Sequence, residues 1–137
     1  MTNRIRDDQE VNIEIAPPTI APPAANYAHA ILVENPARTL HMSGVVPTAP
    51  DGTVPQGLRE QTEVVWSNIV AILTEASMTV RDIVSITTYV VHSEPLADIM
   101  AVRDRILGGH RVASTLVTVP ALARPAWRLE IAVIAAV

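Results

Sequence analysis

Six short runs rich in apolar and β-branched residues indicate β-strands along the chain. They cover residues 11–16, 28–34, 39–43, 83–92, 114–119 and 127–135. Asn35 and Pro36 separate the second run from the third, and turn-forming residues between two strands predict a hairpin. The fourth run is dominated by Val, Ile and Thr, which favour the interior of a sheet. We therefore expect it to form a central strand.

Two further segments carry apolar residues three and four positions apart, which is the spacing of an amphipathic helix. The first extends from Gly57 to about Met78, and its apolar stripe predicts one buried face. The second begins after Ser93, which we expect to be its N-cap, and ends at Gly108 and Gly109. The resulting order, β-β-β-α-β-α-β-β, predicts an α+β fold with both helices on one face of a mixed sheet.

The chain shows no sign of a division into several domains. Residues 1–10 are polar with mixed charge, and we expect them to form a flexible N-terminal arm. Residues 11–137 contain no internal repeat and no low-complexity linker, and their length is typical of one domain. We therefore expect a single domain over residues 11–137.

Two helices can shield only one face of the expected sheet. The last strand lies within LEIAVIAAV, which is largely apolar on both of its alternating faces, and residues 83–92 are similar. Soluble monomers avoid a large exposed apolar patch. We therefore expect self-association through the helix-free face, with cyclic symmetry as the usual outcome.

The composition excludes several kinds of chemistry. The chain has no cysteine, which rules out disulfides, thiolate nucleophiles and cysteine-bound zinc. All ten basic residues are arginine, so a lysine Schiff base and a lysine general base are impossible. The net charge of -4 and the scattered arginines argue against nucleic acid as a partner. With 49% hydrophobic but only 3% aromatic residues, the core must be largely aliphatic.

The sequence gives no signal for a membrane, a metal or a cofactor. The polar N-terminus does not resemble a signal peptide, and no apolar stretch is long enough to span a membrane, so we expect a cytoplasmic protein. His29, His41, His92 and His110 lack metal-ligand spacing such as that of the HExxH motif, so we expect no metal and no other cofactor. His29 and His41 both lie on the expected hairpin, where they could face each other.

Glu130 is the most informative single residue, because it places a carboxylate in the otherwise apolar last strand. Burying an unpaired carboxylate costs free energy. One interpretation is that Glu130 simply faces solvent. The interpretation that we favour is partial burial beside Arg128, on the same face of the strand, with the carboxylate acting as a general base for water.

Six segments of the chain, in their order and spacing, resemble the Rid family of YjgF-like proteins. These segments are NYAHA, HMSGVVP, QTEVVWSNIVAIL, DIVSITTYVV, STLVTVPAL and LEIAVIA, and the resemblance extends from about Pro22 to the C-terminus. It implies a chorismate-mutase-like fold and a homotrimer with small-molecule pockets in the clefts between neighbouring subunits. It also implies hydrolysis of imine or enamine intermediates to a keto acid and ammonia, and some members carry a ribonuclease or translation-inhibitor label.

The same resemblance implies a set of site residues. It assigns catalytic roles to Glu130, Ser114 and Thr115, and substrate binding to Tyr27, Ser43, Gly44, Val45 and Arg111. The family's deaminases bind the substrate carboxylate with an arginine at the position of Ser114, and a hydroxyl cannot reproduce that bidentate contact. Arg111, three residues earlier, could reach the same pocket from a different backbone position.

Three functions therefore remain open. The first is hydrolysis of an imine, an enamine or a related small C=N compound, with Glu130 positioning the attacking water. The second is a non-catalytic trimer that binds a small molecule, or has a regulatory role, without the arginine. The third is an endoribonuclease, which the acidic charge and the lack of a basic patch disfavour.

Overall fold

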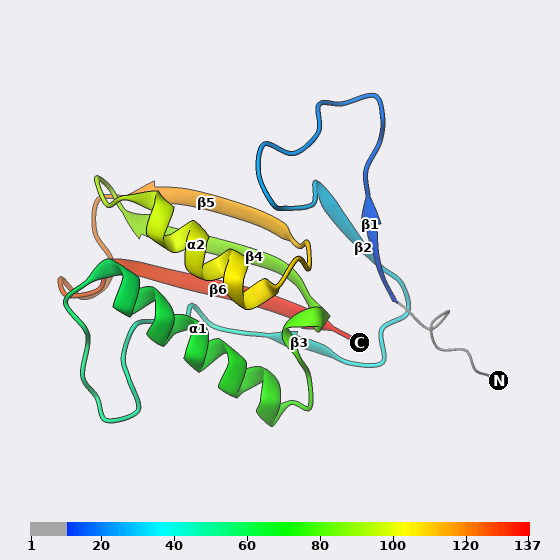
Figure 1. Ribbon diagram of the computed structural model, residues 1–137. Helices are drawn as coiled ribbons and strands as arrows, with labels where there is room; N and C mark the ends of the chain where they lie inside the picture. Colours follow the sequence, from blue (N-terminus) through cyan, green and yellow to red (C-terminus); the bar gives the residue numbers. More distant parts are fainter. Residues whose placement is uncertain (1–10) are drawn as a thin grey trace.

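The computed structural model describes residues 11–137, which have the α+β architecture expected from the sequence (Figure 1). Residues 1–10, for which we predict a flexible arm, lie outside the described residues. Within residues 11–137 the elements are β1 (Asn12–Ile15), β2 (Ala30–Val33), β3 (Thr39–His41), α1 (Leu58–Glu75), the 3-10 helix η2 (Val80–Asp82), β4 (Ile83–Val91), α2 (Leu96–Leu107), β5 (Ala113–Val119) and β6 (Leu129–Ala136). The expected order of strands and helices is confirmed.

Four strands form the main sheet in the order β3-β6-β4-β5. β4 and β6 are antiparallel and occupy the middle, as their apolar sequences predict. β4 and β5 are parallel, and α2 connects them, because parallel neighbours need a crossover connection. β3 pairs antiparallel with the other side of β6. The sheet is therefore mixed, as expected.

Both helices cover the same face of this sheet (Figure 1). The odd-numbered residues of β6 are at most 1% exposed and lie in an aliphatic core with Trp66 of α1, which is fully buried. Side chains alternate along a strand, so the even-numbered residues from 130 to 134 point the other way and remain partly exposed. We call this other side the helix-free face; by strand register it carries Ser85, Thr87, Tyr89, Ala113, Thr115, Val117, Val119, Glu130, Ala132 and Ile134.

The prediction of a hairpin between residues 28–34 and 39–43 is wrong. β2 pairs antiparallel with β1 instead, and the two form a separate two-stranded sheet in which Ile13 lies opposite Leu32. We call this unit, residues 12–33, the β1–β2 ribbon. Figure 1 shows it beside the end of the main sheet, away from α1.

The connection between β2 and β3 explains why they do not pair. Asn35 adopts a left-handed backbone with a φ of 48°, and Pro36 follows it. The chain then joins the C-terminus, since Arg38 and Val137 exchange backbone hydrogen bonds of 3.1 Å. This path lets Leu40 of β3 pack against the core, which pairing with β2 would not provide. Asn35 and Pro36 do form a turn, but it connects strands of two different sheets.

Two local expectations are also wrong. Ser93 is not the N-cap of α2, because it lies in the turn after β4 with a left-handed φ of 75°, and the N-cap is Pro95. His29 and His41 do not face each other, because β2 and β3 do not pair. The expected end of α2 is confirmed, since its C-cap Gly108 has a φ of 57°, a conformation that favours glycine.

Candidate functional site

A first group of predicted site residues meets where the chain leaves β3. The chain pairs with β6 on either side of Ser43 and Gly44, through the amides of Met42 at 3.0 Å and Val45 at 2.7 Å. These amides bond to the carbonyls of Val133 and Ile131, which are two positions apart, whereas Met42 and Val45 are three positions apart. The segment therefore holds one extra residue relative to β6, as in a β-bulge. Among the described residues, no backbone hydrogen bond engages the amides of Ser43 and Gly44. These two amides are therefore available to a ligand.

Glu130 lies directly against this bulge. A Cβ atom on Gly44 would overlap the Glu130 carboxylate and would lie 2.6 Å from its Cδ atom. Glu130 is partly exposed, and its expected neighbour Arg128 pairs with Glu94 instead, with 3.5 Å between Nη1 and Oε1. Within residues 11–137 the Glu130 carboxylate has neither a hydrogen bond nor an ion pair to another side chain. It is a shielded carboxylate that can accept a hydrogen bond from water or a ligand.

A surface groove of about 620 Å³ runs between the bulge and α1. Asn68 of α1 lines it and donates through Nδ2 to the carbonyl of Thr48 at 3.0 Å, which ties the loop after β3 to the helix. Val45 also lines the groove, but it is 8% exposed and both of its backbone groups bond to β6. Val45 therefore anchors the wall of the groove, which has a volume suited to a small metabolite.

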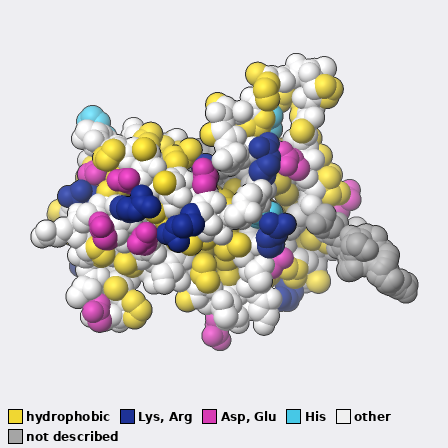
Figure 2. Space-filling view, in the orientation of Figure 1, with side chains coloured by type: hydrophobic (Ala, Val, Ile, Leu, Met, Phe, Trp, Pro, Cys, Tyr) yellow, Lys and Arg dark blue, Asp and Glu magenta, His cyan; other side chains and the backbone are white. Residues whose placement is uncertain are grey.

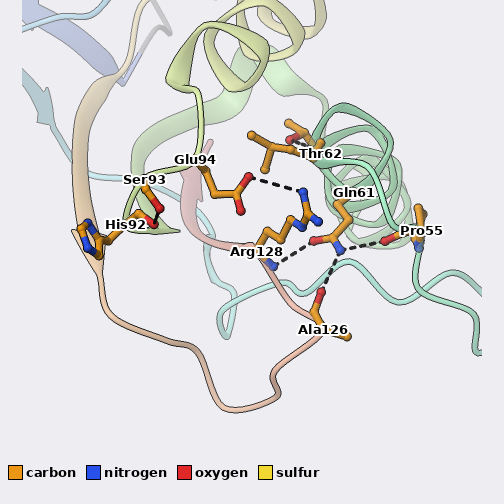
Figure 3. A network of polar contacts seen from close by, with 9 residues as sticks. Pro55, Gln61, Thr62, His92, Ser93, Glu94, Ala126 and Arg128 are labelled. Atoms are coloured by element: carbon orange, nitrogen blue, oxygen red, sulfur yellow. Dashed lines mark hydrogen bonds and ion pairs between the residues drawn. The ribbon is translucent and has the colours of Figure 1, made fainter.

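Gln61 fixes the start of β6 and with it the position of Glu130. Its side chain lies between two loops (Figure 3) and is only 1% exposed. Nε2 donates to the carbonyls of Pro55 at 2.7 Å and Ala126 at 2.8 Å. Oε1 accepts from the amide of Arg128 at 2.9 Å. The buried amide of Gln61 thus holds the loop before α1 and the loop before β6 together. Its partner Arg128 lies two residues before Glu130.

Gln61 and Asn68 shape the site, and neither was predicted from the sequence as a site residue. For Gln61 a signal was present, because it falls on the apolar stripe of α1 between Leu58 and Val65. A buried polar side chain must find hydrogen-bond partners, so a glutamine at such a position indicates a structural network. Asn68 lies at the border of the same stripe, where the pattern gives no comparable signal.

A second group of predicted residues lies at the β5 edge of the sheet. The amide of Ala28 donates to the carbonyl of Val112 at 2.8 Å, which places the segment containing Tyr27 beside the start of β5. The Tyr27 hydroxyl accepts a long hydrogen bond of 3.3 Å from the amide of Ala24, and its ring meets His29 edge-on. The Tyr27 hydroxyl is therefore weakly engaged within the chain.

Ser114 and Thr115 point to opposite faces of the sheet. Ser114 pairs with Ile86, which is buried under the helices, whereas Thr115 pairs with Thr87 on the helix-free face. Thr115 therefore shares a face with Glu130, but the two lie two strands apart, a lateral separation of about 10 Å. Ser114 does not share that face.

Arg111 is paired with Glu14 of β1. Its Nη2 atom lies 3.0 Å from Glu14 Oε2, and its Nε atom lies 3.2 Å from Oε2 and 3.3 Å from Oε1. Hydrogen bonding to Glu14 raises the pKa of Arg111 above its usual value. Arg111 therefore carries a permanent positive charge that an internal carboxylate already balances.

The predicted site residues thus form two separate groups within one chain. The β3–β6 half-site comprises Ser43, Gly44, Val45 and Glu130. The β5 half-site comprises Tyr27, Arg111, Ser114 and Thr115. β4 runs between β6 and β5, so the main sheet itself separates the two half-sites.

The described surface adds little further chemistry. Over the helices, Figure 2 shows acidic and arginine side chains interspersed, with ion pairs such as Arg105 to Glu63 at 3.2 Å, and no clustered basic patch on that face. No group of three or more metal-binding side chains gathers within residues 11–137. None of the helices in that range combines the length and hydropathy needed to cross a bilayer.

The fold and the half-sites define a small α+β protein in which two helices cover one face of a mixed sheet and candidate ligand-binding groups form two separate clusters. Residues 19–137 match the endoribonuclease L-PSP family, and the chain belongs to this family. The solved structure of YyfB from Yersinia pestis, described as a protein of unknown function of the conserved Rid protein family, is similar with a TM-score of 0.85 and 32% identity. That match covers 93% of this chain and 100% of YyfB.

Two curated relatives support the same assignment. A RutC family protein of Pyrococcus abyssi is 33% identical over 80% of this chain and 82% of its own length. A RutC family protein of Buchnera aphidicola is 36% identical over 63% of this chain, and the match spans 62% of that protein. The resemblance to the Rid family and the expected fold class are confirmed.

Proposed function

We propose that the protein works as a homotrimer in which each small-molecule pocket joins the β3–β6 half-site of one copy to the β5 half-site of its neighbour. The separation of the half-sites supports this arrangement, because a single chain cannot bring them together without breaking the main sheet. The helix-free face offers a surface for assembly, since Tyr89 and Val117 on it are 36% and 40% exposed. In the proposed trimer, which closed cyclic symmetry allows, opposite edges of neighbouring sheets lie next to each other.

Within this pocket we propose hydrolysis of a small imine or enamine-derived C=N compound. The observation that carries the proposal is the Glu130 carboxylate, which is half-buried against Gly44 and unpaired among the described residues. As a general base it removes a proton from water while the water oxygen bonds to the C=N carbon, and it passes that proton to the nitrogen. A second proton transfer, from the new hydroxyl to the nitrogen, breaks the C–N bond. The products are a carbonyl compound and ammonia.

The amides of Ser43 and Gly44 supply the polar contacts of this half-site. They are the backbone donors in the bulge that β6 does not use, whereas the amide of Val45 bonds to Ile131. Fixed donors aimed at a site of developing negative charge stabilise it without reorganisation. We therefore assign Ser43 and Gly44 to substrate binding and Val45 to the support of the bulge.

The test is hydrolysis of 2-iminopropionate, generated in situ, followed by the formation of pyruvate. Because Ser114 stands where the family's deaminases carry an arginine, we expect a low wild-type rate and a higher rate for Ser114→Arg. Glu130→Gln should reduce the wild-type rate at least about 100-fold, the contribution typical of a general base. The matched control is Glu75→Gln at the exposed end of α1, which should keep the full rate. Equal rates for wild type and Glu130→Gln would remove the proposed role of the carboxylate.

A non-catalytic ligand-binding trimer is the second candidate. Two features favour it: the family resemblance places Ser114 at the position of the deaminases' arginine, and the nearby Arg111 is paired with Glu14. Hydrolysis by Ser114→Arg but not by wild type, together with binding of small carboxylates by wild type, would select this function. Turnover by wild type would exclude it.

A further inference from the structure

The Arg111–Glu14 pair has the geometry with which arginine binds the carboxylate of a ligand. Two nitrogens of one guanidinium reach both carboxylate oxygens at 3.0 to 3.3 Å. Such two-point contacts are the usual means by which proteins recognise carboxylates. The two residues are 97 positions apart, Glu14 on β1 and Arg111 just before β5, so the contact is a long-range feature of the fold.

A cavity of about 300 Å³ adjoins this pair, between the β1–β2 ribbon and the main sheet. Its lining includes two arginines, Arg81 and Arg111, and one carboxylate residue, Glu14. Withdrawal of Glu14 would leave two positive charges together in a partly enclosed space. An incoming carboxylate anion would restore the balance, and the volume is sufficient for a small metabolite.

Two further polar groups in the cavity wall are held in place. The Nε2 atom of His110 lies 2.9 Å from the carbonyl oxygen of Ile83, which fixes the imidazole ring. Asn12 donates through Nδ2 to the carbonyl of Ala136 at 2.9 Å, while its Oδ1 atom is buried with no hydrogen-bond partner among the described residues. Both side chains are thus fixed by hydrogen bonds to carbonyls of the main sheet, and they shape the cavity wall.

Glu14 can leave Arg111 without disturbing the core. It lies on β1, which pairs with β2 and not with the main sheet. The side chains of Glu14 and Arg111 are 34% and 38% exposed, and exposed ion pairs stabilise a fold only weakly. The pair therefore holds the ribbon against the sheet through a contact that a ligand can replace.

We infer that this cavity is a carboxylate-binding subsite in which Glu14 is a built-in competitor that the carboxylate of a ligand displaces from Arg111. The favoured ligand is a small carboxylate, because its anionic group can take the place of the Glu14 carboxylate on Arg111. The inference rests on the proposed function in one respect, namely that this carboxylate belongs to the molecule handled in the composite pocket. It gives Arg111 the role that an arginine at position 114 has in the family's deaminases.

The test is an NMR titration of the arginine Nε–Hε signals with lactate and, separately, with neutral lactamide. Glu14→Gln removes the competing charge, so lactate should bind about two- to fivefold more tightly than to wild type, the range set by an exposed ion pair. Arg111→Gln should abolish the response to lactate. Glu34→Gln, which removes the same charge from an exposed position just after β2, should leave the affinity unchanged. Lactamide should bind none of the variants measurably.

An unchanged lactate affinity in Glu14→Gln, or lactamide binding as tight as that of lactate, would overturn the inference. The Arg111–Glu14 pair would then only hold the β1–β2 ribbon in place. The mass of the assembly and the rate of imine hydrolysis are measured on the same samples. A trimer that hydrolyses imines but shows no effect of Glu14→Gln on lactate would refute the subsite alone. A monomer in which Glu14→Gln tightens lactate binding would refute the composite pocket and keep the subsite.

Discussion

Replacing Gln61 with methionine tests whether one buried amide fixes the loops beside Glu130. The two side chains are similar in volume, and position 61 is 1% exposed, so the change removes three hydrogen bonds with little change in packing. A buried hydrogen bond contributes about 1 kcal/mol net, and an unpaired partner left without water costs up to about 3 kcal/mol. Ala126 is exposed, so its carbonyl can bond to water instead. We therefore expect a loss of about 3 kcal/mol in the free energy of unfolding.

The assay is urea unfolding followed by circular dichroism, with wild type and variant at one fixed protein concentration because the stability of an oligomer depends on it. The matched control is Gln56→Met, an exposed glutamine just before α1, which should change the free energy of unfolding by less than about 0.5 kcal/mol. A loss below about 1 kcal/mol for Gln61→Met would refute the reasoning, since it would mean that water replaces the amide without cost.

Three further predictions concern other parts of the molecule. Gly44→Ala should displace the neighbouring carboxylate of β6 and lower the rate of imine hydrolysis at least about tenfold with little loss of stability; an unchanged rate would contradict the close contact. Val117→Lys on the helix-free face should dissociate the assembly in sedimentation velocity, whereas Val70→Lys, equally exposed on α1, should not; a trimeric Val117→Lys variant would place the interface elsewhere. Hydrogen bonds from the side chain and the backbone of Thr53 lower the pKa of Asp51 below its usual 3.8. The ionised Asp51 therefore stabilises the fold above that pH, and this effect is lost as the pH falls through the lower pKa of the folded state. Thr53→Val should raise the NMR titration midpoint of Asp51, and an unmoved midpoint would exclude the hydroxyl as the cause.

The helices and the central strands could be predicted from the sequence because their signals are local and periodic. The stripe of α1 repeats three and four residues apart, and its members Leu58, Val65, Ile69 and Leu73 are buried, whereas Ile72, which the same pattern predicted to be buried, is 38% exposed. The β-branched run that forms β4 lies in the middle of the sheet. The pairing of β2 could not be predicted in this way, because the turn at Asn35 does not reveal which distant strand offers a free edge. Strand partners 93 to 97 positions apart, such as those of β3 and β6, leave no local mark in the sequence.

For the candidate site, the sequence supplied the residue types but not their arrangement. The proximity of Gly44 and Glu130 follows from pairing between segments far apart in the chain, and only the structure reveals it. The same is true of Arg111 and Glu14, because a salt bridge between residues 97 positions apart has no sequence signature. The opposite orientations of Ser114 and Thr115 depend on strand register, which a one-residue shift would reverse.

The most direct test of the composite pocket is the mass of the purified protein by sedimentation equilibrium at micromolar concentration. In the proposed pocket a neighbouring copy completes each half-site, so we predict the mass of three chains, stable on dilution through that range. A particle with the mass of one chain would mean that Glu130 and Arg111 never share a ligand, and the account of the pocket would be wrong.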